Sequence, residues 1–206
     1  ALSKEFDSPR GVPISAIILG GRRTQLIPLV VESFNWPHGV FIGARSGSET
    51  TAAAAHKVGV LRRDPMAMLP FCGYNMGDYF KHWLNIGKRL TNPPKIYSVN
   101  WFRADDNDEF IWPGFGENIR VLKWIVDRVN NRVKAEETPL GLRPYLKDLE
   151  LSGLNIKSDR LDKLFEINPQ EWPQELDDTE QFLVQFGERT PKEIWQEFNK
   201  LKAKFP

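Results

Sequence analysis

Five aromatic residues and two asparagines are concentrated in two short segments of the sequence, where they could form a pocket for a flat ring. Residues 100–103 read NWFR and residues 110–118 read FIWPGFGEN. Aromatic faces on either side of a turn can stack against a purine, and the amide of Asn118 offers donors and an acceptor to the edge of the ring. The same aromatic residues could instead form the core of a β-hairpin, and Asn118 could be the N-cap of a following helix.

A second segment could bind phosphate. Residues 20–23 read GGRR and directly follow an apolar run at residues 14–19. Ligands of α/β proteins gather at the carboxyl ends of strands, and guanidinium groups match phosphate oxygens bidentately. The alternative for this short pattern is a turn with two solvated arginines.

The other reactive residue types form no recognisable site. The histidines His38, His56 and His82 lack the spacing of metal ligands, and Cys72 is the one cysteine. The acidic segment 105–109 lacks the glycine and glutamate spacing of an EF-hand and is expected to be a solvated turn. No Gly-x-x-x-x-Gly-Lys-[Ser/Thr] phosphate loop occurs in the sequence. We therefore assign no metal ligand to this chain.

Four segments of the sequence resemble GTP-dependent phosphoenolpyruvate carboxykinases. They are, in order, residues 20–23, residues 48–55 (SETTAAAA), residues 63–76 (RDPMAMLPFCGYNM) and the aromatic segments within 100–118. The resemblance is strong from residue 11 to about residue 124 and weaker beyond, and it is closer to bacterial than to animal members. It implies that residues 1–206 are a C-terminal fragment, about one third of such an enzyme.

The resemblance implies roles for individual residues of a nucleotide site. Arg22 corresponds to the arginine that contacts the terminal phosphates, and it would be catalytic by stabilising the charge of the transferring phosphoryl group. The residues that correspond to the guanine pocket are the stacking rings Phe102, Phe110 and Phe115 and the residues that read the base edge, Phe115, Gly116, Glu117 and Asn118. Trp101 and Trp112 are expected to be packing residues.

Residues 43–59 correspond to the mobile Ω-loop of the family, a lid that closes over the substrates and keeps water from the enolate intermediate. The lid residues assigned by this match are Ser48, Glu49, Thr50 and Thr51. Animal members carry an arginine directly before the Ser-Glu pair, where this sequence has Gly47, and the nearest arginine is Arg45. The resemblance therefore leaves the role of Arg45 open.

The resemblance also implies an activity for the intact protein. It would be a monomeric lyase that converts oxaloacetate and GTP to phosphoenolpyruvate, GDP and carbon dioxide in gluconeogenesis, with Mn²⁺ and Mg²⁺ as cofactors. The family's phosphate loop, its lysine, histidine and aspartate ligands of manganese and its Asn-x-Arg substrate motif are missing from this sequence.

The fragment is therefore expected to be inactive without the N-terminal portion of the same protein. The alternatives are a stand-alone guanine-nucleotide-binding module without catalysis, and an interaction domain whose aromatic cluster is core and binds no nucleotide.

The composition restricts the class of protein. Lys and Arg number 28 and Asp and Glu number 27 in 206 residues, so the sequence carries no electrostatic footprint for nucleic acid. No apolar run approaches the length of a membrane span, and the first residues show no signal-peptide pattern. A single cysteine fits a reducing compartment. We therefore expect a cytoplasmic protein that binds neither nucleic acid nor membrane.

An α/β fold must position these segments, and we expect a mixed sheet with peripheral helices, a partial C-terminal nucleotide-binding domain of the carboxykinase type. Residues 14–19, 40–42 and 95–102 have the β-branched, apolar character of strands, whereas residues 26–36 could be a strand or a short helix. The alanine-rich residues 52–55 could be helical because alanine has the highest helix propensity.

Helices are expected on both sides of the aromatic segments. Residues 76–90 have helical period, and apolar side chains recur at helical spacing over residues 119–129. Residues 11–132 would form the core of the nucleotide site with its lid, and residues 133–206 a helical C-terminal cover. Three helices are expected in this cover, signalled by Ser158, Asn168 and Thr190, and nothing catalytic is visible in it.

Overall fold

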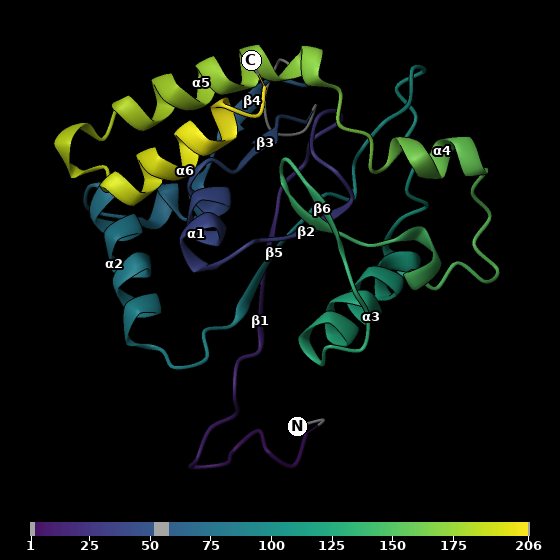
Figure 1. Cartoon of the computed structure of the whole chain (residues 1–206), viewed down its shortest axis with the longest axis horizontal. Helices are drawn as coiled ribbons and strands as arrows, with labels where there is room; N and C mark the ends of the chain where they lie inside the picture. The colour runs from purple at the N-terminus through teal and green to yellow at the C-terminus, as the bar shows by residue number, and fades with distance from the viewer. Residues whose placement is uncertain (1–2, 52–57, 206) are drawn as a thin grey trace.

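The computed structural model describes residues 3–51 and 58–205. They form an α/β fold with a five-stranded mixed sheet and helices around it, which confirms the predicted fold class (Figure 1). The strands, in their order across the sheet, are β1 (Ala16–Gly20), β5 (Lys95–Val99), β2 (Val30–Glu32), β7 (Gly141–Arg143) and β6 (Glu136–Thr138). Only the pair of β1 and β5 is parallel among these described strands.

The helices divide between the two sides of the sheet (Figure 1). Their bounds are α1 (Trp36–Ala44), α2 (Met76–Arg89), α3 (Asn118–Val129), α4 (Ser158–Lys163), α5 (Trp172–Val184) and α6 (Lys192–Lys202). Six short 3₁₀ turns were also found among the described residues: Pro65–Ala67, Leu69–Phe71, Phe115–Glu117, Leu146–Asp148, Pro169–Glu171 and Gly187–Arg189. Helices α1, α2, α5 and α6 share one hydrophobic core, and β2, β5, α3 and α4 share a second.

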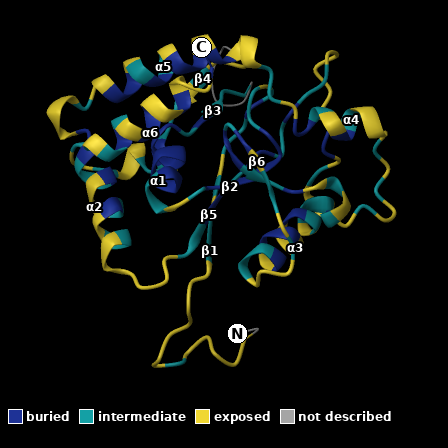
Figure 2. Cartoon of the chain, viewed as in Figure 1, coloured by how far each residue is buried: buried dark blue, intermediate teal, exposed yellow. Residues whose placement is uncertain are grey.

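The buried residues follow this division (Figure 2). The first core is built around Phe41, Phe80 and Trp172, and the second around Tyr97 and Trp124, all of which are at most 1% exposed. Burying an aromatic or large aliphatic side chain contributes about 1.5–3 kcal/mol, so these rings dominate the stability of the fold. The N-terminal residues 3–14 are largely exposed and extend away from both cores.

The predicted strand at residues 40–42 is wrong, because these residues lie in helix α1. The side chain of Asn35 caps this helix by accepting from the backbone N–H of His38 at 3.0 Å, and Pro37 lies in its first turn. Residues 38–44 are all buried, so the helix is apolar on every side and shows no helical period. A short, fully buried helix therefore has the same sequence pattern as a covered strand.

The other predicted elements next to the site are confirmed. Helix α2 spans Met76–Arg89, with the side chain of Asn75 accepting from the N–H of Gly77 at 2.8 Å, and strand β5 begins at Lys95. Helix α3 is also where its spacing predicts it. Its core face is Val121, Trp124 and Ile125, whereas Ile119, Leu122 and Val126, which recur at helical spacing in the sequence, are exposed. The ambiguous residues 26–36 contain β2.

The C-terminal segment supplies the three expected helices, α4, α5 and α6, and it also supplies two strands. Strands β6 and β7 come from this segment and form one edge of the main sheet. Among the described residues no helix is both long and apolar enough to cross a membrane.

A buried ion pair fastens α3 to the sheet. Glu32 in β2 accepts from Arg128 Nε at 2.6 Å and Nη2 at 3.1 Å, and from the Tyr97 hydroxyl at 3.3 Å. Lys95 Nζ lies 3.0 Å from the same carboxylate. A paired carboxylate with several donors is tolerated in a core, and this one fixes the register of α3 on β2 and β5. Burial raises the pKa of the Tyr97 hydroxyl, so it remains a donor.

Candidate functional site

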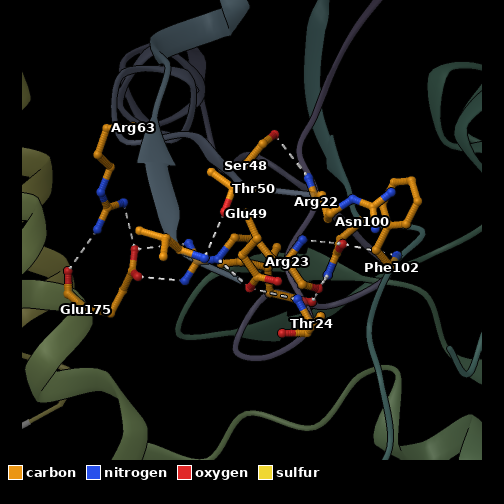
Figure 3. A network of polar contacts seen from close by, with 12 residues as sticks. Arg22, Arg23, Thr24, Ser48, Glu49, Thr50, Arg63, Asn100, Phe102 and Glu175 are labelled. Atoms are coloured by element: carbon orange, nitrogen blue, oxygen red, sulfur yellow. Dashed lines mark hydrogen bonds and ion pairs between the residues drawn. The ribbon is translucent and has the colours of Figure 1, made fainter. Parts of the chain in front are cut away.

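The loops that follow the two parallel strands meet at one buried side chain, Asn100 (Figure 3). Its Oδ1 accepts from the backbone N–H groups of Arg23 and Phe102, both at 3.2 Å. Its Nδ2 donates to the backbone carbonyls of Arg23 and Ile27, both at 2.8 Å. Because β1 and β5 run in the same direction, their carboxyl ends lie at one edge of the sheet, where ligands of α/β proteins bind. Asn100 joins the phosphate candidate and the aromatic candidate at that edge.

Two of the three predicted stacking rings contact each other. Phe102 and Phe110 meet edge to face with ring centroids 5.7 Å apart, and Ala104 pairs with Phe110 in an isolated β-bridge. Phe110 is 48% exposed and Phe115 is 91% exposed, so neither ring is a core residue in this chain. Trp112, which is 2% exposed, is a core residue, but these two phenylalanines are not. The alternative that the whole aromatic cluster is hydrophobic core is therefore wrong.

The segment that ends the aromatic cluster leads directly into α3. Gly114 has φ +118°, a value that L side chains rarely adopt, and Phe115–Glu117 form a single 3₁₀ turn. Asn118 begins α3, but among the described residues its side chain accepts from no backbone N–H. Its Oδ1 instead accepts from the indole Nε1 of Trp112 at 2.8 Å. The N-cap alternative for this side chain is therefore wrong.

Arg22 lies between the aromatic rings and the lid segment (Figure 3). Its guanidinium carbon is 4.3 Å from the ring centroid of Phe102 and 5.7 Å from that of Phe110. Its backbone N–H donates to Ser48 Oγ at 3.2 Å. A guanidinium over an aromatic face is attracted to the ring and keeps its outer N–H groups free to bind an anion. The structure thus brings the predicted phosphate residue and two predicted base-stacking residues together.

Strands β3 (Gly47–Glu49) and β4 (Leu61–Arg63) dock on the loop of Arg22. They are here called the lid hairpin because β3 lies within the predicted lid, residues 43–59, although β4 lies beyond it. The N–H of Glu49 donates to the carbonyl of Arg22 at 2.9 Å, and the Glu49 carboxylate accepts from the N–H of Thr24 at 2.9 Å. The approach is close, since a Cβ added to Gly21 would lie 2.4 Å from the carbonyl oxygen of Gly47.

The predicted lid is described only in part. Thr50 pairs with Val60, the N–H of Thr50 donating to the carbonyl of Val60 at 2.9 Å, which extends the lid hairpin by one residue. Thr51 is the last described residue before the gap. The predicted alanine-rich residues 52–55, and His56, lie outside the described residues.

One carboxylate from the C-terminal segment connects the arginines behind the site, and the sequence gives no local sign of it. Glu175 in α5 lies 2.7 Å from Arg23 Nη2, 2.9 Å from Arg63 Nη1 and 3.6 Å from Arg45 Nη1 (Figure 3). Burial opposes the ionisation of Glu175, but the arginines, Arg23 foremost, hold its pKa below its ordinary value. Burial also lowers the pKa of Arg45 to about 10, against the opposing effect of Glu175.

The cluster of Glu175 and its arginines bears on two expectations from the sequence. Arg45, whose role was open, is buried and pairs with Glu175 behind the lid hairpin. The C-terminal cover, in which nothing catalytic is visible from the sequence, supplies the carboxylate that pairs with three arginines near the site. Glu175 lies 112 residues from Arg63 in sequence, so no spacing pattern could connect the two.

The remaining candidates have structural surroundings. His38 is buried with its Nδ1 accepting from the N–H of Phe34 at 3.1 Å, and burial, with Arg45 and two lysines nearby, lowers its pKa to about 3. Asp105 accepts from the N–H groups of Asn107 and Glu109 in a turn. Within residues 3–51 and 58–205 no group of three or more His, Cys, Asp or Glu side chains could hold a metal ion.

The comparison with known protein families agrees with the geometry. Residues 1–204 match the family described as "Phosphoenolpyruvate carboxykinase C-terminal P-loop domain". The chain belongs to this phosphoenolpyruvate carboxykinase family.

Several curated relatives are named "Phosphoenolpyruvate carboxykinase [GTP]". The relative from Thermoplasma volcanium is 52% identical over 197 residues, which are 96% of this chain and 33% of the relative. The relative from Anaeromyxobacter dehalogenans strain 2CP-1 is 51% identical over 194 residues, 94% of this chain and 33% of the relative. The relative from Corynebacterium kroppenstedtii is 51% identical over 202 residues, 97% of this chain and 32% of the relative.

The chain thus spans about a third of the length of the curated carboxykinase relatives it matches. The resemblance that the four sequence segments indicated is confirmed at the level of the family. The family description names a P-loop, and the consensus of that loop does not occur in this sequence.

Proposed function

We propose that this chain is the C-terminal part of a GTP-dependent phosphoenolpyruvate carboxykinase and carries its guanine-nucleotide site. The observation that carries the proposal is the position of Arg22, which lies on the ring of Phe102 and is bonded to the lid hairpin through Ser48. A cation, stacking rings and a lid segment lie together at the carboxyl ends of parallel strands. Residues 11–132 form the site and its lid in this proposal, and residues 133–206 form the cover.

Each part of the site has a separate task. Phe102, Phe110 and Phe115 stack against the base, and Gly116, Glu117 and Asn118 present backbone and amide groups to its edge. Base stacking on an aromatic ring is worth about 1–3 kcal/mol per base. Arg22 binds the terminal phosphates and stabilises the charge that moves with the phosphoryl group.

The intact protein, in this proposal, is a lyase of gluconeogenesis in the cytoplasm, monomeric, that converts oxaloacetate and GTP to phosphoenolpyruvate, GDP and carbon dioxide. Closure of the lid segment keeps water from the enolate that accepts the phosphoryl group. Mn²⁺ and Mg²⁺, which the carboxykinase resemblance implies, find no donor set among the described residues. Their ligands are assigned to the rest of the intact protein, and the chain alone is expected to produce no phosphoenolpyruvate.

Titration of the intact protein with GDP and ADP tests the proposal. GDP should bind more tightly than ADP, and Phe115→Ala should weaken GDP binding by roughly ten- to hundred-fold, because one stacking face is lost. Phe115 is 91% exposed, so this substitution removes no core contact. Cys72→Ser is the control, since Cys72 contacts the carbonyl of Tyr74 and lies outside the site.

The outcomes separate three functions. An unchanged affinity for GDP in Phe115→Ala, with the fold intact, would show that the rings bind no base. Guanine binding by the intact protein without formation of phosphoenolpyruvate would support a stand-alone nucleotide-binding module. Binding of neither nucleotide would support an interaction domain.

A further inference from the structure

The indole of Trp112 has one polar atom, and that atom is bonded to the side chain of Asn118. Trp112 is 2% exposed and packs in the second core, with its ring centroid 6.4 Å from that of Trp101. Its Nε1 donates to Asn118 Oδ1 at 2.8 Å. Packing against the core and Trp101 holds the indole in place, so the direction of its N–H is fixed by the fold.

This hydrogen bond decides which end of the Asn118 amide faces the core. An indole N–H can donate and cannot accept, so only the amide oxygen can be its partner. An unrestrained asparagine can turn its amide by 180° and exchange oxygen for nitrogen at the same place. In this chain Oδ1 is held against Trp112, and Nδ2, with its two N–H donors, is directed to the opposite side.

The donors of Asn118 remain available for a ligand. Within residues 3–51 and 58–205 the bond from Trp112 is the one hydrogen bond of this side chain, and the start of α3 takes no cap from it. Asn118 follows directly on Phe115–Glu117, the 3₁₀ turn that carries the 91% exposed ring of Phe115. A pair of amide donors beside an open aromatic face matches a ring that carries an acceptor on its edge.

We propose that Trp112 determines the base specificity of the site by holding the Asn118 amide with its donors toward the ligand. The inference rests on the proposed function and names the part of the base that is read. The 6-oxo group of guanine or hypoxanthine accepts from the Asn118 donors. The 6-amino group of adenine is itself a donor and meets Nδ2 without a hydrogen bond, so adenine is rejected by an unpaired polar contact.

The substitution Trp112→Phe in the intact protein tests this inference. It keeps an aromatic ring in the core and removes the N–H, so the amide of Asn118 is free to turn and to accept from adenine. We expect the ratio of the ADP and GDP dissociation constants to fall by about tenfold, which corresponds to the loss of one oriented hydrogen bond. IDP shares the 6-oxo group with GDP and lacks its 2-amino group, so IDP and GDP should lose affinity in the same proportion.

Trp101→Phe is the matched control. It makes the same chemical change in the neighbouring indole, which does not contact Asn118 through a hydrogen bond in the described structure, and it should leave the ADP to GDP ratio unchanged. Thermal unfolding of both variants shows whether the ring packing is kept. A merely structural role of Trp112 would lower the affinity for all three nucleotides equally and leave the ratio unchanged.

Asn118→Asp decides the question if Trp112→Phe does not fold. A carboxylate in the first turn of α3 is favourable for the helix and can still accept from Trp112. It presents an acceptor to the base, so GDP and IDP should bind at least tenfold more weakly while ADP is affected less.

An unchanged ratio in a folded Trp112→Phe, or equal losses for the three nucleotides in Asn118→Asp, overturns the inference. If Phe115→Ala still weakens GDP binding, the proposed function stands in that case. If the unsubstituted protein binds no guanine nucleotide, the proposed function fails and this inference fails with it.

Discussion

The guanidinium of Arg22 rests on the ring of Phe102, with 4.3 Å between the guanidinium carbon and the ring centroid. This contact joins the group assigned to phosphate with a group assigned to the base. A cation over an aromatic face is stabilised by about 0.5–1 kcal/mol at an exposed site, so Arg22 is positioned before any ligand binds.

Replacing Arg22 by lysine should weaken nucleotide binding although the charge is kept. Lysine is a point charge that cannot bind phosphate with a planar fork, and it loses the flat stacking on Phe102. We expect the KM for GTP of the intact protein to rise roughly ten- to hundred-fold, the range of one charge-assisted hydrogen bond. Arg62→Lys in the lid hairpin, where the side chain is 66% exposed, is the control and should leave KM unchanged.

Gly21→Ala should push the lid hairpin from the loop of Arg22. The added Cβ would lie 2.4 Å from the carbonyl oxygen of Gly47, a backbone atom that cannot turn aside. We expect a loss of about 1–3 kcal/mol in the free energy of unfolding, measured with denaturant, and faster hydrogen exchange at Glu49. Gly73→Ala is the matched control, because a Cβ there meets nothing within 4 Å. Equal stability of the two variants would contradict the close docking.

Glu175→Gln should destabilise the chain because it leaves the buried Arg23 and Arg45 and the half-buried Arg63 without their shared carboxylate. Removal of one partner from a buried ion pair costs about 3–5 kcal/mol, and the side chain of Glu175 is only 2% exposed. Glu180→Gln is the matched control on the same helix, since that carboxylate is 42% exposed and pairs with Lys202, and should change stability by less than about 0.5 kcal/mol. Similar unfolding midpoints for both variants would show that the cluster contributes little.

His38 should make the stability of the chain depend on pH in mildly acidic solution. Burial lowers its pKa from 6.5 to about 3, so the folded chain holds this imidazole neutral. Below pH 6.5 the unfolded chain binds a proton that the folded chain does not, and stability falls as the pH falls toward about 3. The slope from this group approaches about 1.4 kcal/mol per pH unit.

His38→Asn removes the titration and keeps an acceptor for the N–H of Phe34. The stability of this variant should fall less between pH 7 and pH 4 than that of the unsubstituted chain, measured by denaturant unfolding at each pH. His82→Asn changes an exposed histidine on α2 and should reproduce the original slope. An identical slope for His38→Asn would mean that the buried imidazole titrates normally.

The sequence was sufficient where local pattern decides structure. The helical period of α2, the apolar run of β5 and the sequence segments of the family were all readable in advance, because each depends on neighbouring residues. Helix α1 was not, since burial on all sides removes its period. Strands β6 and β7 have three residues each, too few for an alternating pattern to show.

Some residues of the candidate site could be predicted from the sequence and others could not. The positions of Arg22, Phe102 and Phe110 came from sequence motifs, and the structure brings these three together. Glu175 could not be found, because its partners are distant in the sequence and a glutamate within an amphipathic helix resembles any solvated one. The bond from Trp112 to Asn118 was equally hidden, although both residues lie in one motif, because a tryptophan in an aromatic cluster is read first as packing.

Asn100 fixes the distance between two loops at the edge of the sheet. Its amide is hydrogen-bonded to the backbone of Arg23 and of Phe102, and Asn100 is 0% exposed, so it holds the loop of Arg22 and the loop of Phe102 together. In the proposed site, the distance between the guanidinium of Arg22 and the aromatic rings is therefore set by the protein and not by the ligand. If the proposed site binds nucleotide, a ligand whose ring and anion are at another separation should contact either the rings or Arg22, whereas a ligand with the matching separation should contact both without a rearrangement of the protein.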